Sequence, residues 1–458
     1  RKEKRIMDKI LKNATVVTSG YVKKMDIGIQ GGRIAALAES LDEPGEVIDC
    51  TGKLVLAGGV DVHAHLNEPG YTWREDYLHG TRAAAAGGTT CFVDMPLQNT
   101  PSLISAQIFR DKEKAVAGKA YVDYAFWGGL VEDNLDEMTG MKECGAKALK
   151  AFVSPSGPDY PSASIGLIYQ AMQIAAKEDI LLGFHCEDYS MITRYQEQAI
   201  RQGKNTWRDY LDARPVIAEE IAVQNILDMA EETGARVHIC HVSHPKVAER
   251  IRRAKQKGIR VTAETCPHYL IYSEEDVIRG KGVFKCSPPL RKAQDRDALW
   301  KYINNGTLSC IVSDHSPAAP EEKADQLSVW EIWGGISGLQ TGMQVMYEYG
   351  VRQGKISLNT FAAIMSENAA SIFRLPGKGR IEIGQDADLI VFDPEKSWKI
   401  TPDSLYYLNK ISAYCGLEGK GMTEKTIVRG NIVYDNGTFG GTPVGNHPDI
   451  LEQHVPSD

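Results

Sequence analysis

The stretch LVLAGGVDVHAH at residues 54–65 decides the predicted fold. It begins as an apolar run and ends in two histidines, a pattern typical of a buried parallel strand that carries polar side chains at its carboxyl end. Seven further apolar runs follow, separated by stretches with helical periodicity. Strands that alternate with helices indicate repeated βα units, and eight units favour a closed (β/α)8 barrel. An open doubly wound sheet would alternate too, but the GxGxxG turn of such sheets does not follow the first run.

The predicted elements of the barrel are placed as follows. The strands are 54–63, 89–95, 122–128, 146–153, 180–185, 236–242, 260–266 and 308–314. The clearest helices are 102–117, 163–178, 214–233 and 245–257.

Both ends of the chain have a different pattern of apolar and polar residues. Residues 10–48 alternate between apolar and polar positions around Gly31-Gly32, and RIEIGQDADLIVFD and KTIVRGNIVYDNGTF repeat this pattern after residue 380. Because chain termini often lie close together, we predict one small β-sandwich built from both ends. The predicted domains are a sandwich at 7–58 and 376–441, a barrel at 59–375 and an extended tail at 442–458.

The composition is that of a folded globular protein. Hydrophobic residues make up 43% of the 458 residues and charged residues 24%, which excludes a disordered or collagen-like chain. The formal net charge of −8 argues against nucleic-acid or membrane-surface partners, which need a basic face. The nine cysteines are scattered without a CxxC pair, and no apolar stretch reaches the roughly 18 residues of a membrane span. We therefore expect a cytoplasmic protein.

Polar residues that end the apolar runs point to a metal site. His63 and His65 end the first run and share one side of an extended chain, while His185, His241 and Asp314 end three others. The carboxyl ends of barrel strands meet at one face, so these side chains are expected to converge. Nitrogen and oxygen donors of this kind suit zinc, cobalt, iron or manganese better than calcium.

The other histidines have a simpler interpretation. His238 shares a run with His241, and the position nearer the strand end favours His241 as the ligand. The histidines predicted to be packed and hydrogen-bonded are His79, His238, His244 and His268, and those predicted to lie in the tail are His447 and His454.

Lys150 lies inside the apolar run AKALKAFV, where an unpaired ammonium is costly. It could be a snorkelling or salt-bridged lysine. Alternatively, desolvation and nearby cations could deprotonate it, so that it forms a carbamate with CO2 and bridges two metals. The residues alone leave both interpretations open.

Together the motifs resemble those of the cyclic amidohydrolases. They are HAH at 63, Lys150, HCED at 185, HVSH at 241, ETCPHYL at 264, SDHSP at 313 and GKGRIEIGQDADLIVFD near 377, and they cover nearly the whole chain. The resemblance implies two divalent metal ions, most simply zinc, and a homotetramer. In this family the HxH pair and the aspartate hold one metal, two further histidines hold the other, and a carboxylated lysine bridges them. Those positions are His63, His65, Asp314, His185, His241 and Lys150.

The family chemistry is hydrolysis of a cyclic amide. Two metals lower the pKa of a bridging water and polarise the substrate carbonyl. The resemblance implies that the resulting hydroxide attacks the ring amide. Asp314 would take the proton and pass it to the leaving nitrogen.

The substrate follows from departures within the family. Dihydroorotases carry an arginine two residues after HxH, whereas this chain has Asn67, which cannot replace a bidentate carboxylate partner. Hydantoinases place a tyrosine shortly after the lysine, whereas here Ser154 lies in AFVSPSG. This stretch and WGGISGLQTG at 333–342 resemble allantoinases, which implies conversion of (S)-allantoin to allantoate. The expected substrate contacts are Asn67, Ser154, Ser287, Gly335 and Ser337.

The sequence leaves two alternative functions open and predicts one mobile segment. A hydantoinase or dihydropyrimidinase would keep the metal chemistry and open hydantoin or dihydrouracil. A non-catalytic scaffold relative would have lost metal ligands, but every ligand position is filled here. The polar stretch 318–330, just after Asp314, is predicted to form a lid.

Overall fold

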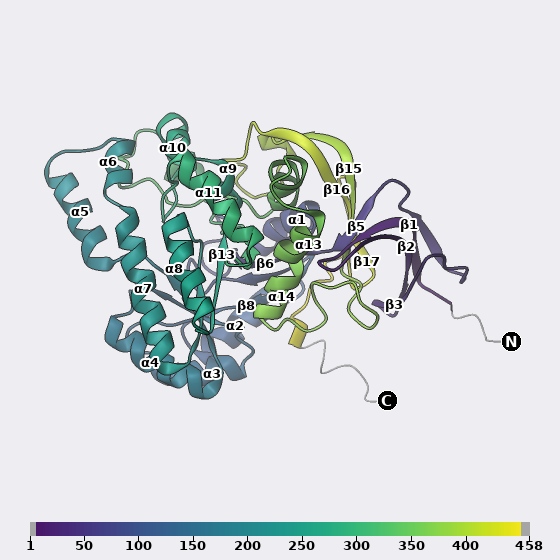
Figure 1. Ribbon diagram of the computed structural model, residues 1–458, viewed down its shortest axis with the longest axis horizontal. Helices are drawn as coiled ribbons and strands as arrows, with labels where there is room; N and C mark the ends of the chain where they lie inside the picture. The colour runs from purple at the N-terminus through teal and green to yellow at the C-terminus, as the bar shows by residue number, and fades with distance from the viewer. Residues whose placement is uncertain (1–5, 450–458) are drawn as a thin grey trace.

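The computed structural model describes residues 6–449, and parallel strands form its centre (Figure 1). They make two hydrogen-bonded sheets, in the orders β6-β7-β8 and β9-β10-β11-β12-β13-β14. The pairings within both sheets are parallel, which confirms the predicted α/β class. The strands are β6 (Gly59–Ala64), β7 (Thr89–Asp94), β8 (Asp123–Phe126), β9 (Gly128–Gly129), β10 (Leu149–Phe152), β11 (Leu181–His185), β12 (Arg236–Ile239), β13 (Val261–Thr265) and β14 (Cys310–Ile311).

Helices lie between these strands in the chain and around them in space (Figure 1). The α-helices are α1 (Tyr77–Gly87), α2 (Ala106–Val116), α3 (Met138–Glu143), α4 (Ile165–Glu178), α5 (Tyr189–Arg201), α6 (Trp207–Asp212), α7 (Val216–Thr233), α8 (Pro245–Gln256), α9 (Pro267–Ile271), α10 (Glu274–Gly280), α11 (Ala293–Asn304), α12 (Gly342–Met346), α13 (Leu358–Ala362) and α14 (Asn368–Ile372). No helix within residues 6–449 is long and apolar enough to cross a membrane.

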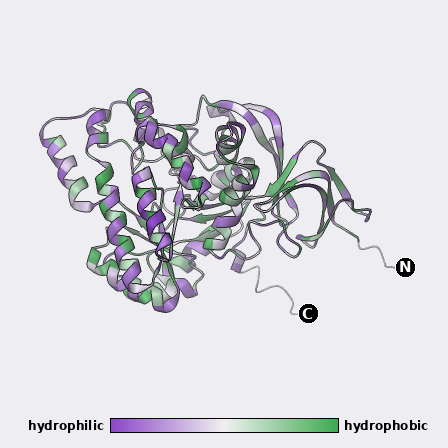
Figure 2. Cartoon of the chain, in the orientation of Figure 1, coloured by the Kyte–Doolittle hydropathy of each residue, from purple (hydrophilic) through white to green (hydrophobic). Residues whose placement is uncertain are grey.

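Helix α8 illustrates why these segments are helical. Pro245 occupies its first turn, where the missing N–H costs nothing, and His244 caps the helix by accepting a hydrogen bond from the Lys246 N–H at 3.1 Å. Its buried residues recur every three or four positions and are Val247, Ala248, Ile251 and Ala254. Hydrophobic and hydrophilic residues alternate along the outer helices in Figure 2, as in amphipathic helices generally.

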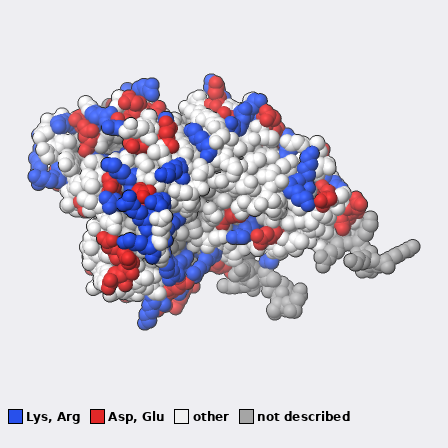
Figure 3. Space-filling view, in the orientation of Figure 1, with Lys and Arg blue, Asp and Glu red and all other residues white. Residues whose placement is uncertain are grey.

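Charges of both signs share the visible surface (Figure 3). Basic side chains gather around α8, where Arg250 pairs with Glu220 and both Arg252 and Arg253 pair with Glu249. These ion pairs neutralise much of the positive charge around α8.

Strands from both chain ends form one mixed sheet, the terminal sheet, in the order β18-β17-β16-β15-β5-β1-β2-β3 with β4 beside β1. The ends join at β5, which is parallel to β1 and antiparallel to β15. This sheet lies to the right of the parallel strands in Figure 1. Its strands are β1 (Lys9–Val17), β2 (Val22–Gln30), β3 (Arg33–Ala38), β4 (Glu46–Asp49), β5 (Leu54–Ala57), β15 (Leu389–Lys399), β16 (Glu418–Val428), β17 (Asn431–Asp435) and β18 (Thr438–Phe439).

The predicted single strand 54–63 is wrong, because the chain changes sheets within it. β5 belongs to the terminal sheet and β6 to the parallel strands. Gly58 lies between them, where a Cβ atom would come within 2.1 Å of the Thr90 side chain. Only glycine lets the backbone pass this close, so the apolar run is interrupted without a polar residue to signal the break.

Residues 444–449 of the predicted tail dock on the parallel strands rather than fray. The Gly445 N–H donates to the Ala120 carbonyl at 2.8 Å, and the Asn446 N–H donates to Asp123 at 2.8 Å. His447 is buried. A Cβ at Gly445 would lie 2.0 Å from the Val122 carbonyl oxygen, so glycine permits the close contact. His454 and the rest of 450–458 lie outside the described residues.

Candidate metal centre

The six predicted ligands lie on or just after the parallel strands. His63 is on β6 and His65 follows it, Lys150 is on β10 and His185 ends β11. The last two ligands, His241 and Asp314, follow β12 and β14. All except Asp314 are buried, and the Asp314 side chain is 15% exposed.

The structure brings the imidazoles and Asp314 together. The Nε2 atoms of His63 and His65 lie 3.1 and 3.4 Å from Oδ1 of Asp314, and the ligand atoms of these three residues are all within 4.8 Å of one another. The ring of His241 is centred 5.4 Å from that of His63 and 4.7 Å from that of His185. The four histidines therefore form one contiguous cluster.

Lys150 sits among these histidines. Next to burial, its positive charge opposes protonation of each of the four rings, which places its ammonium near all of them. The residue is fully buried, and among residues 6–449 its Nζ has no hydrogen-bond partner. The snorkelling and salt-bridged interpretations do not fit this environment, because both require water or a carboxylate at Nζ.

Two buried carboxylates orient the imidazoles from behind. Glu264 contacts Nδ1 of His63 with one oxygen and Nε2 of His238, at 2.9 Å, with the other. Glu187 lies 2.7 Å from Nε2 of His185 and accepts from Arg214 at 2.8 Å. Such outer carboxylates fix ring orientation and raise ligand basicity at metal sites. Sequence reasoning missed both, although they stand in the quoted HCED and ETCPHYL motifs.

The electrostatics favour metal-binding protonation states at His65, His185, His241 and Asp314, but favour the protonated ring at His63. Burial lowers the pKa of His65, His185 and His241, so these rings are neutral and have a free lone pair at neutral pH. Burial opposes the charge of Asp314, but the adjacent His63 and His65 outweigh it and hold its pKa well below the usual value. The carboxylate therefore stays ionised. Burial and Lys150 also oppose the charge of His63, yet Glu264 and Asp314 raise its pKa well above the usual value.

Strained backbone clusters at this face. Asn67, Gln98, His241 and Asp314 all have positive φ, between 35° and 61°, and each follows a parallel strand. Non-glycine residues adopt this conformation at a cost, and such residues concentrate at functional sites.

The predicted substrate contacts lie in loops with varied surroundings. Asn67 is fully buried beside Gln98, and Ser154 is buried directly after β10. Ser287 shares a 3.0 Å hydrogen bond with the Tyr210 hydroxyl. The Gly335 N–H donates to the Lys285 carbonyl at 2.9 Å, and the Ser337 carbonyl accepts from Ser412 at 2.6 Å.

Lys285, which is buried, and Lys323, which is half-buried, hold the predicted lid segment 318–330 and the residues after it. Lys285 donates to the carbonyls of Val329 and Ile332 at 2.7 and 2.6 Å. Lys323 donates to the carbonyls of Gly282, Trp333 and Gly335 at 2.7 to 2.9 Å. The segment is therefore anchored to the loop that carries Ser287.

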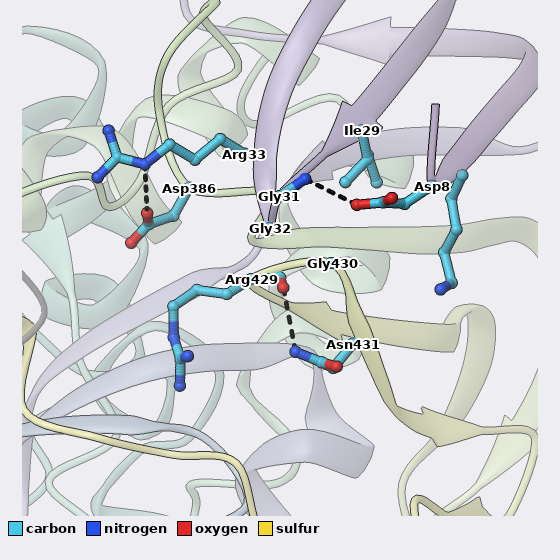
Figure 4. Close-up of a pocket in the computed structure, with 10 residues that line it drawn as sticks. Asp8, Ile29, Gly31, Gly32, Arg33, Asp386, Arg429, Gly430 and Asn431 are labelled. Carbon is cyan, nitrogen blue, oxygen red and sulfur yellow. Dashed lines mark hydrogen bonds and ion pairs between the residues drawn. The ribbon is translucent and has the colours of Figure 1, made fainter. Parts of the chain in front are cut away.

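Two cavities differ in their relation to the cluster. One of about 490 Å³ lies on the terminal sheet between Asp8, Arg33 and Asn431, and none of the predicted site residues lines it (Figure 4). Another of about 500 Å³ is lined by Val153 and Asp188, which follow β10 and β11. None of the predicted site residues lines the second cavity either, although Val153 and Asp188 place it beyond the carboxyl ends of β10 and β11.

Comparison with known proteins agrees with this geometry. The chain is 39% identical over 433 residues to an allantoinase of Salmonella choleraesuis (strain SC-B67), which covers 93% of this chain and 95% of that protein, and an allantoinase of Salmonella newport (strain SL254) gives the same values. L-hydantoinase (dihydropyrimidinase) from Arthrobacter aurescens superposes with a TM-score of 0.93 at 30% identity, covering 96% of this chain and 99% of that chain. Dihydropyrimidinase from Brevibacillus agri NCHU1002 superposes with a TM-score of 0.90 at 29% identity, covering 96% and 98%. Residues 54–433 match the model of the Amidohydrolase family, and the chain belongs to that family.

Proposed function

We propose that this protein hydrolyses the ring amide of allantoin to give allantoate, as a step of purine and ureide breakdown. The observation that carries hydrolysis is the cluster in which ligand atoms of His63, His65 and Asp314 lie within 4.8 Å of one another, with Lys150, whose Nζ has no partner among the described residues, beside the same histidines. The 39% identity to allantoinases supports allantoin as the substrate. Hydantoin and dihydrouracil rings are the alternative, supported by the hydantoinase and dihydropyrimidinase structures. The complete ligand set argues against a non-catalytic scaffold.

We infer that the cluster holds two divalent metal ions, with zinc first and cobalt, iron or manganese as alternatives. The donor set of imidazole and carboxylate suits these ions. Orphaned buried atoms support the fit, because Nδ1 of His241 and Nζ of Lys150 have no partner within residues 6–449. Carboxylation of Lys150 would supply a bridging anion. The proposed ligands are His63, His65 and Asp314 for one ion, His185 and His241 for the other, and Lys150 for both.

The protein's own groups then have defined tasks. When bound, the metal ions would lower the pKa of water and polarise the ring carbonyl. Asp314, which is ionised at neutral pH, accepts the proton of the attacking water and returns it to the ring nitrogen as the C–N bond breaks. Glu264 and Glu187 keep the imidazoles in place during this transfer. The products of ring and water are one carboxylic acid and one free amide nitrogen.

We also infer a closed (β/α)8 barrel and a sandwich folded from the terminal sheet, with the domain limits predicted above. The His65 N–H donates to the His315 carbonyl at 2.8 Å, which links the first strand to the last and supports closure. Residues of both chain ends, including Leu11, Val55 and Leu389, share one buried core, which supports the sandwich. A homotetramer follows from the family resemblance. The nine cysteines, all within residues 6–449, are free, which supports a cytoplasmic location.

Ring turnover tests the proposal. One metal-loaded preparation is assayed with allantoin, hydantoin, dihydrouracil and dihydroorotate, each with and without a chelator. We expect chelator-sensitive opening of allantoin well above the other three. A preference for hydantoin or dihydrouracil would show that allantoin is not the substrate. No turnover of any ring by a metal-replete sample would overturn the proposed activity.

A further inference from the structure

Two buried arginines lie behind the histidines that are proposed for the second metal ion, His185 and His241. Arg214 stands two residues before α7 and Arg291 two residues before α11, and their side chains are 11% and 7% exposed. They pair with two buried carboxylates, those of Glu187 and Glu219. Neither arginine is among the predicted site residues. Buried ion pairs are weak evidence for stability, so we asked what else this one holds in place.

Arg214 contacts the surroundings of His185 through Glu187. Its Nε and one terminal nitrogen donate to the two oxygens of Glu187, at 3.1 and 2.8 Å. The second of these oxygens lies 2.7 Å from Nε2 of His185. The bidentate pairing fixes the plane of the carboxylate, and the carboxylate fixes the plane of the imidazole. Because Glu187 occupies Nε2, Nδ1 is the atom of His185 that is left for a metal ion.

Arg291 contacts the surroundings of the other histidine through Ser243, which stands two residues after His241. Its Nε donates to the Ser243 hydroxyl at 3.0 Å, and one terminal nitrogen donates to Glu219 at 3.1 Å. Glu219 also accepts from the Ser243 main-chain N–H at 3.0 Å and contacts the Ser243 hydroxyl. His241 itself has a φ of 35°, a costly conformation that its surroundings must maintain.

Arg291 also connects the two sets of contacts. Its remaining terminal nitrogen donates to the main-chain carbonyl of Arg214 at 2.7 Å. Its three nitrogens therefore bind three segments that are separate in the chain. The Asp188 N–H donates to the Ala218 carbonyl at 3.0 Å, which ties the loop after β11 to the same turn of α7. A planar guanidinium holds three acceptors at fixed angles, whereas a lysine ammonium has a single donor centre.

We propose that Arg291 is a positioning residue that sets the placement of His185 relative to His241, and thereby the affinity for the second metal ion. The inference rests on the proposed metal centre and adds a residue outside its ligand set. The two ring centres lie 4.7 Å apart, although His185 ends β11 and His241 follows β12. A residue that contacts the surroundings of both keeps this spacing. The contacts of Arg291 do not lead to β6 or β14, which precede or carry the ligands of the first ion.

Metal titration tests the inference without relying on turnover. Metal-free protein is titrated with Co²⁺ against a competing chelator, which gives an affinity for each of two ions. We expect Arg291→Met to lower the affinity for the second ion by about tenfold to a hundredfold, the usual cost of losing an outer partner of a metal ligand. The affinity for the first ion should fall less. The cobalt absorption spectrum identifies the ion that is lost, with His185→Ala as the reference for a protein without a second-ion ligand.

Arg250→Met is the matched control. Arg250 donates to Glu220, the neighbour of Glu219 on α7, at 3.1 and 2.9 Å. The variant removes an arginine–glutamate pair from the same helix without a contact to either histidine, so both affinities should equal those of the wild type. Arg291→Lys keeps the positive charge but offers one donor centre, and we expect it to lower the second affinity too. Wild-type affinities in Arg291→Lys would show that charge alone matters and would overturn the positioning role.

Ser243→Ala keeps the inference testable if Arg291→Met does not fold. It removes the hydroxyl between Arg291 and Glu219 and leaves their ion pair in place. We expect the affinity for the second ion to fall by about threefold to tenfold, the effect of one lost hydrogen bond. Circular dichroism and denaturant unfolding of each metal-free variant show whether metal is lost without loss of the fold.

The outcomes separate this inference from the proposed function. A lower second-ion affinity in Arg291→Met and Ser243→Ala, but not in Arg250→Met, supports the inference. If the wild type binds two ions and the first two variants bind both as tightly, or lose both equally, the inference is wrong and the proposed function stands. If the wild type binds fewer than two ions, the proposed metal centre fails and the inference fails with it. If the metal-replete wild type opens no ring, the proposed hydrolysis fails, and the titration still decides the inference.

Discussion

Lys150 and Lys378 are both buried lysines, yet their surroundings are opposite. Lys378 contacts three carboxylates, with Asp386 and Asp388 at 2.9 Å and Asp123 closer still. Burial disfavours its charge, but Asp123 and Asp388 raise its pKa well above the usual value. Lys150 lies near four imidazoles and 5.4 Å from the centre of the Phe152 ring, and its Nζ is unpartnered within residues 6–449.

The two sites also lie at different ends of the parallel strands. Asp123 begins β8, and Lys378 joins it to the terminal sheet through Asp388, next to β15. Lys150 is on β10, whose neighbour β11 ends in His185. Paired charge at the amino ends of barrel strands serves stability, whereas polar groups at the carboxyl ends serve chemistry. The same side chain is thus a structural tie in one region and a metal-ligand candidate in the other.

The same substitution at both sites tests this contrast, and the largest expected effect is at Lys150. Lys150→Met should lower kcat/KM for allantoin at least about a thousandfold and reduce bound metal, because the bridging ligand is lost. Native mass spectrometry should show loss of an increment equal to one CO2. Metal content and activity like those of the wild type would remove Lys150 from the site.

Lys378→Met should act on stability instead. Three carboxylates lose their common cation, and removing one partner of a buried ion pair costs about 3–5 kcal/mol. Denaturant unfolding of the metal-free proteins measures this free energy, with metal-free Lys150→Met as the reference. There, an apolar side chain of similar length replaces an unpaired ammonium, so we expect no loss. Equal free energies of unfolding for the two variants would contradict the interpretation that Lys378 stabilises the fold and Lys150 does not.

Lys285 and Lys323 stand between these two cases. Their ammonium groups donate to main-chain carbonyls, so they have hydrogen-bond partners, but no carboxylate within residues 6–449 pairs with them. Burial, then the charge of Arg214, lowers the pKa of Lys285 to about 7, and burial, then Lys285, lowers that of Lys323 to about 7. In the unfolded chain a lysine titrates near about 10.4. Between pH 7 and 10 the unfolded state therefore binds more protons, so these two groups make stability rise with pH.

The expected size of this effect is about 2 kcal/mol for the two lysines together between pH 7 and 8. It is measured as the difference in free energy of unfolding between the wild type and the double variant Lys285→Met, Lys323→Met at each pH. Lys24→Met, at an exposed position of β2, is the control. If the free energy of unfolding changed with pH in the same way for the wild type and the double variant, the pKa values of Lys285 and Lys323 would not be lowered.

The features that could be predicted from the sequence are those that depend on residues close together in the chain. Helices α4, α7 and α8 begin within two residues of their predicted starts, because caps and apolar periodicity mark them. The ligand cluster could also be anticipated, because strand ends converge in any parallel α/β fold. Whether these residues hold metal stays a prediction.

The features that escaped prediction depend on contacts between distant segments. The domain limit is predicted at residue 58, but the end of the strand there is not, because it depends on the close approach of Thr90 to the backbone of Gly58. Residues 444–449 dock through Asp123, more than 300 positions earlier. Lys378 and Glu264 look like ordinary charged residues in the sequence, since Asp123 on β8 pairs with the first and His238 on β12 contacts the second.

The pairing of β5 with β15 has a consequence for how the protein is made. Ala57 is hydrogen-bonded opposite Leu389, so about 330 residues must be synthesised between the two partners. At roughly 5–20 residues per second, the nascent chain carries β5 with one open edge for about 15 to 70 seconds. All four residues of that strand are buried in the finished protein. The ribosome-bound intermediate therefore exposes a ready template for aggregation, and its protection during translation becomes a requirement of this topology.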